Sequence, residues 1–166
     1  LCDTSVIEYP DAKQLAEMAK SAARVVRLFG FDPKIAFLSH STFGEPATDR
    51  TKRLSDAVEI LKKDNVDFKF DGEMQPDVAL EEVYKELYPF SEIVGSSNVL
   101  IMPSQHSAAI SYKMIKSMSR AKVIGPLLVG LGQPIEIAPL RSSTSDIINL
   151  ASIAAYSADV IQYKKN

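Results

Sequence analysis

Short apolar runs of strand length alternate along this chain with segments that have the periodicity of amphipathic helices. Residues 34–39 (KIAFLS), 66–70 and 98–102 are predicted strands, and residues 11–29 repeat apolar side chains at helical spacing. This alternation is typical of a mostly parallel sheet with helices on both faces. We therefore predict an α/β fold with three α/β/α layers.

The middle of the chain carries two further helix signals. Asp49 can cap the helix that follows the first strand. Pro76 stands where the first turn of a helix tolerates proline. The apolar residues that mark the helix beginning there are Leu80, Val83, Tyr84 and Leu87.

The last third of the chain predicts two more short strands, residues 121–132 and 133–138, and then a helix. Apolar residues recur in this helix at helical spacing, at Ile147, Ala151, Ala154, Ala158 and Ile161. Ser143 and Asp146 fit a capping box, in which the two side chains satisfy free backbone N–H groups at the start of the helix.

Composition and charge exclude several classes of function. The net charge is −2 and no basic block exceeds two residues, so we expect no nucleic-acid partner. No apolar run reaches the roughly 20 residues of a membrane helix and there is no signal peptide. We therefore expect no membrane partner and a cytoplasmic location. The single cysteine, Cys2, excludes an internal disulfide and lies in an amino-terminal segment that is predicted to fray.

Polar loops follow all three predicted strands, at the edge where open α/β sheets bind ligands. These loops are residues 39–44, 71–75 and 103–107. Residues 125–146 add a corner in which Arg141 and a run of serines lead into the last helix. Free N–H groups and the helix dipole favour an anion there. We expect a crevice for an anionic small molecule.

Several of the polar residues have two interpretations. His40 and His106 could form a metal site or an acid/base pair, but no acidic or cysteine ligand stands at a recognised spacing, so we expect no metal and favour ordinary loop histidines. Asp71 and Glu73 are either paired carboxylates or a turn aspartate that closes on Gly72 and a solvated glutamate. No glycine-rich nucleotide-binding motif is present.

Five motifs together resemble one protein family. They are FGFDPKIAFLSHSTFG at residues 29–44, DGEMQPDVAL at 71–80, NVLIMP at 98–103, ISYKMI at 110–115 and IGPLLVGLGQPIEI at 124–137. In this order and spacing they resemble the carboxyl-terminal half of phosphate acetyltransferases, and still more the phosphotransacetylase-like tail of bacterial hybrid malic enzymes. The resemblance implies a fold like that of isocitrate and isopropylmalate dehydrogenases. It also implies that residues 11–166 are this tail, and that residues 1–10 are a linker from an amino-terminal catalytic region.

Phosphate acetyltransferases move an acetyl group between coenzyme A and phosphate, and the resemblance allows their signature to be located here. The family places a Ser-Arg pair shortly after the segment that matches residues 133–134, with an aspartate seven residues beyond the serine. Pro139 and Leu140 occupy the Ser-Arg positions in this chain, whereas Asp146 occupies the aspartate position. Proline has no hydroxyl and leucine no charge, so neither role can be filled. Arg141 stands one residue late.

The malic enzyme tails commonly show the same loss, which gives the leading hypothesis. The amino-terminal part of those enzymes decarboxylates malate oxidatively to pyruvate with NADP and a divalent metal, Mg or Mn. The tail is implied to bind acetyl-CoA as an effector and to form homo-oligomers, without cofactor or catalytic residue of its own. The residues that we expect to line its ligand crevice are Ser39, Ser41, Thr42, Asp71, Glu73, Gln75, Tyr112, Lys113 and Arg141.

Two rival hypotheses remain from the sequence. One is an active half of a phosphate acetyltransferase, with Asp146 as a base. The other is a dimerisation module that no longer binds a ligand. The first predicts formation of acetyl phosphate from acetyl-CoA, and the second predicts no response to acetyl-CoA.

Overall fold

The computed structural model describes residues 1–120 and 122–163, with side chains through residue 159. The chain forms two compact units, which we call unit 1 (Leu1–Tyr112) and unit 2 (Lys113–Asn166). Helix α4 (Gln105–Met118) begins in unit 1 and ends in unit 2. None of the helices in these described ranges is long and apolar enough to cross a membrane.

The sheet of unit 1 has three parallel strands, with β1 (Lys34–Leu38) between β2 (Lys69–Met74) and β3 (Val99–Ile101). The three strands predicted in this part of the chain are confirmed, but β2 was predicted too early, at residues 66–70. Its pairing with β1 begins at Lys69, and the preceding Val66 and Phe68 pack against the core instead.

The close approach of β2 to β1 depends on Gly72. Its φ is +142°, and a Cβ atom built there would lie 2.9 Å from both the Cβ and the carbonyl oxygen of Phe37. The pairing between the two strands shifts register just after Phe37. Only glycine combines this backbone conformation with so short a distance.

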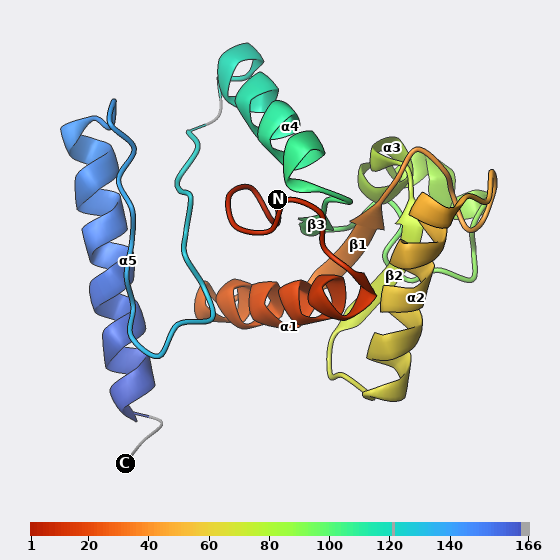
Figure 1. Cartoon of the computed structure of the whole chain (residues 1–166), viewed down its shortest axis with the longest axis horizontal. Helices are drawn as coiled ribbons and strands as arrows, with labels where there is room; N and C mark the ends of the chain where they lie inside the picture. The colour runs from red at the N-terminus through yellow and green to blue at the C-terminus, as the bar shows by residue number, and fades with distance from the viewer. Residues whose placement is uncertain (121, 164–166) are drawn as a thin grey trace. The chain divides into compact units, whose positions relative to one another are not determined.

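Helices cover both faces of this sheet, because successive side chains of a strand point to opposite faces. Ile35 and Phe37 lie in one core with α1 (Ala12–Leu28) and α2 (Asp49–Lys63). Ala36 and Leu38 lie in a second core with α3 (Pro76–Leu80), residues 93–94 and Ala108 of α4. Figure 1 shows α1 and α2 beside the strands. The α/β prediction with helices on both faces is confirmed.

Helix α1 shows why the strongest periodic segment was predicted correctly. Asp11 accepts a hydrogen bond from the backbone of Gln14 (2.8 Å), and the Gln14 side chain accepts one from the backbone of Asp11 (2.9 Å). This capping box starts the helix one residue after the predicted start. Small buried residues, Ala16, Ala19 and Ala23, let the helix approach the sheet closely.

Two predictions for the middle of the chain were wrong. Thr48, not Asp49, caps α2, because the Thr48 side chain accepts from the backbone of Thr51. The helix predicted from Pro76 stops at Leu80, since Glu81 is extended, and a 3₁₀ helix η1 (Glu82–Glu86) follows. The predicted apolar residues of this helix are divided: Tyr84 packs on the second core, whereas Leu80, Val83 and Leu87 are exposed.

The first ten residues pack on unit 1 rather than fray. The Cys2 backbone pairs beside β3, donating to Leu100 (2.9 Å) and accepting from Met102 (2.6 Å). Pro10 is fully buried. The prediction of a fraying Cys2 was wrong, because β3 is an outer strand of the sheet and the backbone of Cys2 pairs with its free edge. The linker role of residues 1–10 stays a prediction.

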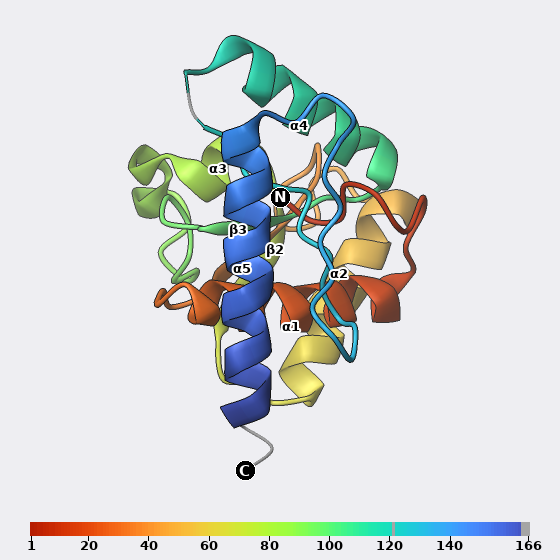
Figure 2. The same ribbon diagram turned by 90° about the vertical axis from the view of Figure 1, so that its left-hand side faces the viewer.

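Unit 2 differs most from the sequence prediction. Residues 122–143 contain no strand in the described structure, although two were predicted at 121–132 and 133–138, since no other segment pairs with their backbone. Helix α5 (Thr144–Tyr163) confirms the last predicted helix, and Figure 2 shows it as one straight element. The side chain of Ile161 lies outside the described residues.

Candidate functional site

A cleft opens at the carboxyl ends of β1 and β3, where the topology predicts a ligand site. Its volume is about 400 Å³, within the range of pockets for small molecules, roughly 300–1,000 Å³. It lies wholly within unit 1 and draws on α2, the first turn of α4 and the amino-terminal segment. Its lining residues are Tyr9, Leu38, Ser39, His40, Arg50, Arg53, Leu54, Pro76, Met102, Pro103, Ser104 and Ser107.

Two arginines give this cleft a positive charge. The lining contains Arg50 and Arg53 and no carboxylate. Among the described residues neither arginine forms an ion pair. Uncompensated guanidinium groups beside a cavity favour an anionic ligand, and their planar forks suit carboxylate and phosphate.

Arg53 is held in a fixed orientation. Its two terminal nitrogens donate to the backbone oxygens of Pro10 (2.6 Å) and Pro103 (2.8 Å), and its guanidinium lies 3.7 Å from the centre of the Tyr9 ring. Its Nε is buried without a hydrogen-bond partner. Arg53 thus joins three segments at the cleft wall, whereas the exposed Arg50 is free to reorient.

The first turn of α4 adds hydroxyl groups to the same wall. The Ser107 side chain donates to the backbone oxygen of Ser104 (2.9 Å), and the Ser104 side chain accepts from the Ser107 backbone (3.4 Å). The positive end of the α4 dipole is therefore at the cleft. The predicted rim loops 39–44 and 103–107 both contribute lining residues, through Ser39 and His40 and through Pro103, Ser104 and Ser107.

Glu73 was predicted at the rim but lies inside the protein, with 1% of its surface exposed. One carboxylate oxygen accepts from the Ser41 side chain (2.9 Å) and the Gly44 backbone (2.8 Å), and the other accepts from the Ser55 side chain (2.5 Å). Burial raises the pKa of Glu73, but the hydrogen bonds from Ser55, Gly44 and Ser41 outweigh it and hold the pKa below 4.5. Glu73 and Ser41 therefore fix the loop after β1 to β2 and α2.

The remaining predicted residues of unit 1 also lie outside the cleft lining. Asp71 accepts a hydrogen bond from the backbone of Gly72 (2.9 Å), as predicted, but it lies within strand β2 rather than in a turn. Thr42 accepts from the backbone of Gln75 (3.2 Å) and so joins the two loops. Tyr112 is half-buried on α4. Of the predicted set in unit 1, only Ser39 reaches the cleft.

Sequence reasoning missed Arg50, Arg53 and Tyr9. The two arginines look like ordinary solvated helix residues, yet they follow a loop at the carboxyl edge of β1, and this position was a usable signal. No sequence pattern indicated Tyr9, because it reaches Arg53 only through the packing of the amino-terminal segment.

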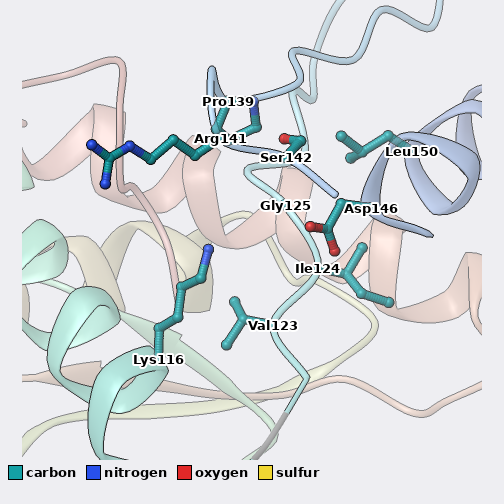
Figure 3. A pocket seen from close by; sticks show the side chains of 9 residues that line it. All are labelled: Lys116, Val123, Ile124, Gly125, Pro139, Arg141, Ser142, Asp146 and Leu150. Carbon is teal, nitrogen blue, oxygen red and sulfur yellow. The ribbon is translucent and has the colours of Figure 1, made fainter. Parts of the chain in front are cut away.

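The corner at residues 125–146 forms a much smaller pocket in unit 2, about 60 Å³ in volume. Lys116, Arg141, Ser142 and Asp146 line it, as Figure 3 shows. In Figure 3 the Arg141 side chain extends away from Ser142 and Asp146. The exposed Lys113, also predicted to bind the ligand, does not line this pocket. A volume of 60 Å³ holds a few water molecules but no acyl-CoA.

Asp146 forms the predicted capping box with Ser143. Its carboxylate accepts from the Ser143 backbone (2.9 Å) and side chain (2.8 Å), and the Ser143 side chain accepts from the Asp146 backbone (3.2 Å). The hydrogen bonds from Ser143, with the nearby charges of Lys116 and Lys122, lower the pKa of Asp146. A carboxylate held in this way stabilises the start of α5 and is a weak proton acceptor.

Comparison with known proteins agrees with this architecture. The sequence profile described as phosphate acetyl/butaryl transferase matches residues 1–155. The chain belongs to this family. The NADP-dependent malic enzyme of Rhizobium meliloti is 46% identical over 95% of this chain, and that of Escherichia coli is 36% identical over 95%. The phosphate acetyltransferase of Bacillus subtilis is 35% identical over 94%.

The chain spans only part of these relatives. The matched region is 21% of the two malic enzymes and 49% of the Bacillus subtilis enzyme. Among solved structures, a phosphotransacetylase from Streptococcus pyogenes matches 94% of this chain and 48% of its own, with 36% identity and a TM-score of 0.88. EutD phosphotransacetylase from Staphylococcus aureus matches with a TM-score of 0.84 and 30% identity, over 93% of this chain and 48% of its own.

Proposed function

We propose that this chain is the effector-binding part of an NADP-dependent malic enzyme and that it binds an acyl-CoA, foremost acetyl-CoA, in the cleft of unit 1. The observation that carries this proposal is a cleft of about 400 Å³ with two arginines and no carboxylate in its lining. The identity of 46% to a malic enzyme over 95% of the chain supports the choice of parent enzyme.

The residues of the cleft have distinct roles in this proposal. An acyl-CoA carries several phosphate groups, and Arg53 presents a pre-oriented guanidinium to one of them at little further entropic cost. Arg50 is exposed and swings onto a second phosphate. The hydroxyls of Ser39 and Ser104, with the first turn of α4, provide further hydrogen bonds.

We propose further that this part of the protein transfers no acyl group. Pro139 and Leu140 stand where transferases of this family are expected to carry serine and arginine, and Leu140 is fully exposed to solvent. The corner pocket of about 60 Å³ is too small for the substrates. Asp146 is occupied as a helix cap.

The second candidate function is phosphate acetyltransferase activity, and one observation supports it. Arg141, Ser142 and Asp146 line a single pocket, so an arginine and a serine are still present at the pocket of the aspartate despite the displaced register. The identity of 35% to the Bacillus subtilis phosphate acetyltransferase fits this candidate as well.

The wider proposal concerns the parent protein. Oxidative decarboxylation of malate, with NADP and Mg or Mn, is assigned to a malic enzyme region outside this chain. Among the described residues no three His, Cys, Asp or Glu side chains come together as a metal site. Homo-oligomerisation through this domain, a cytoplasmic location and an isocitrate dehydrogenase-like fold belong to the same proposal. Regulation requires acyl-CoA to favour one state of the assembly over another.

Calorimetric titration with acetyl-CoA tests the proposal. We expect binding to the wild-type chain and at least about tenfold weaker binding to Arg50→Ala, because a charge-assisted hydrogen bond contributes about 1.5–3 kcal/mol. Arg24→Ala is the control, since Arg24 is exposed on α1 and, among the described residues, donates only to Ser21. No heat with millimolar acetyl-CoA would refute effector binding. Formation of acetyl phosphate from acetyl-CoA would instead establish the second candidate.

A further inference from the structure

The segment before α1 is joined to the rest of unit 1 mainly at its two ends. We call residues 2–10 the strap, and Figure 1 shows it as the red loop ahead of α1. At one end the Cys2 carbonyl accepts from the Met102 backbone (2.6 Å) beside β3. Near the other end the Glu8 carbonyl accepts from the Gln105 backbone (3.0 Å) at the start of α4.

Between these attachments the strap closes on itself. The Asp3 carboxylate accepts from the backbones of residues 5, 6 and 7 at 2.7–3.0 Å. The described structure shows no hydrogen bond from residues 3–7 to any other segment. A segment held by few hydrogen bonds opens at a much lower free energy than the whole domain unfolds. The strap can therefore open while the sheet stays folded.

The strap also forms part of the cleft wall. Tyr9 lines the cleft and is 59% exposed. Arg53, another lining residue, donates to the Pro10 carbonyl (2.6 Å) and lies 3.7 Å from the centre of the Tyr9 ring. Opening of the strap removes Tyr9 from the wall and takes two of the three contacts that orient the Arg53 guanidinium. The cleft lining is thus complete only when the strap is docked.

We propose that the strap is a closing element coupled to the cleft, and that an acyl-CoA in the cleft holds it docked. This inference rests on the proposed function and identifies the element on which the effector acts. A ligand that binds one of two states better shifts the protein toward that state. The strap is also the segment that we predict to link this domain to the malic enzyme region, so its docking transmits the presence of the effector to that region.

The contacts of Arg53 favour closure over opening. An anion that took Arg53 away from its carbonyl partners would open the strap instead. However, a guanidinium has five N–H groups, and the bonds to Pro10 and Pro103 use one on each terminal nitrogen. Each terminal nitrogen keeps a second N–H for an anion, so the ligand and the strap bind Arg53 together.

Hydrogen exchange measured by NMR on the chain 1–166 tests this inference. The reporters are the amides of Met102 and Gln105, because both donate to carbonyls of the strap. We expect them to exchange about 100-fold more slowly with acetyl-CoA at about 100 times its Kd, because the open state is then depleted by that factor. The Asn65 amide, which donates to Lys62 at the end of α2 (3.2 Å), is the control and should change little.

Two variants of the strap separate coupling from general stabilisation. Tyr9→Ala removes the ring that stacks on Arg53. With each variant at about 100 times its own Kd, it should reduce the slowing of the reporter amides about threefold, as expected for the loss of a cation–π contact. Val6→Ala is the matched control, since Val6 is 66% exposed on the strap and does not line the cleft, and it should leave the slowing unchanged.

Three results of the exchange experiment would overturn the inference. Reporter amides that exchange equally fast with and without bound ligand would show that strap and cleft are independent, and the proposed function would stand. Faster exchange with ligand would show that the ligand opens the strap. Reporter amides that exchange in the free chain as slowly as the core amides of α1 would show that the strap does not open by itself. A calorimetric titration without heat would instead refute the proposed function, and the inference with it.

Discussion

Replacement of Glu73 by glutamine tests an unusual electrostatic feature of unit 1, a buried carboxylate that forms no ion pair among the described residues. In the described structure the Glu73 carboxylate accepts three hydrogen bonds, from Ser41, Gly44 and Ser55. Glutamine keeps one oxygen for the first two, which become neutral bonds and weaken by about 1 kcal/mol each. Its amide nitrogen replaces the oxygen that accepts from Ser55, so this hydroxyl must reorient.

We expect Glu73→Gln to lower the free energy of unfolding by about 2 kcal/mol, since relief from burying a charge offsets part of the loss. Glu73→Ala removes the acceptor of all three donors, leaves the Gly44 N–H unpaired and creates a cavity, and should lower the free energy of unfolding by about 4 kcal/mol or more. Glu59→Gln is the matched control, because Glu59 is exposed and its ion pair with Lys62 contributes about 0–1 kcal/mol.

The pH dependence of the same variant gives a second test. Folding lowers the pKa of Glu73 below 4.5, so the ionised carboxylate stabilises the fold above the unfolded-state pKa. This contribution is lost as the pH falls through the folded-state pKa. Glutamine does not titrate. The difference between wild type and Glu73→Gln should therefore be largest near about pH 7 and shrink below about pH 4.

Urea unfolding followed by far-ultraviolet circular dichroism measures these differences, and hydrogen exchange in α1 and α2 assigns them to unit 1. Equal stability of the wild type and Glu73→Gln at about pH 7 would refute the role of the network. A difference that stays constant into the acid range would refute the lowered pKa.

Three further predictions concern backbone, cap and thiol. Gly72→Ala should lower the free energy of unfolding in urea by about 2–4 kcal/mol, because the added Cβ has no room beside β1 and φ is positive at this position. Gly132→Ala is the control and should change the free energy of unfolding little, because a Cβ at Gly132 would lie in open space. Ser143→Ala should speed hydrogen exchange in the first turn of α5 by about fivefold, as expected for a lost cap worth about 1 kcal/mol, and unchanged exchange would argue against the capping box. Burial raises the pKa of Cys2, so alkylation should be at least about tenfold slower in the native protein than in urea. Equal rates would show a frayed terminus.

The sequence predicted the elements that carry their own local signals. Residues 11–29 combine helical periodicity with a capping box, and the structure begins α1 at Ala12. The apolar runs that became β1 and β3 were recognised because strands buried on both faces are apolar throughout. Topology then predicted the correct edge of the sheet for the cleft.

The individual residues in and around the cleft were harder to predict, because their roles depend on distant neighbours. Glu73 looks like a solvated rim glutamate until Ser41, Gly44 and Ser55 are placed around it, and Ser55 comes from helix α2. Arg53 looks like a helix surface charge until the amino-terminal segment brings Pro10 and Tyr9 to it. The spacing of residues along the sequence indicates neither the contacts of Glu73 nor those of Arg53.

The same physical reason explains why the two predicted strands of unit 2 did not form and why α5 is exposed. Strand formation requires a hydrogen-bonding partner, and the preference of valine, leucine and isoleucine for strands reflects packing against such a partner. In natural proteins the local structural preference of a segment usually agrees with the environment that the segment has in the folded protein. Residues 124–137 prefer a paired, buried strand, yet no segment in the described structure pairs with their backbone and five of their large aliphatic side chains are exposed. Local preference therefore could not decide the structure of this segment.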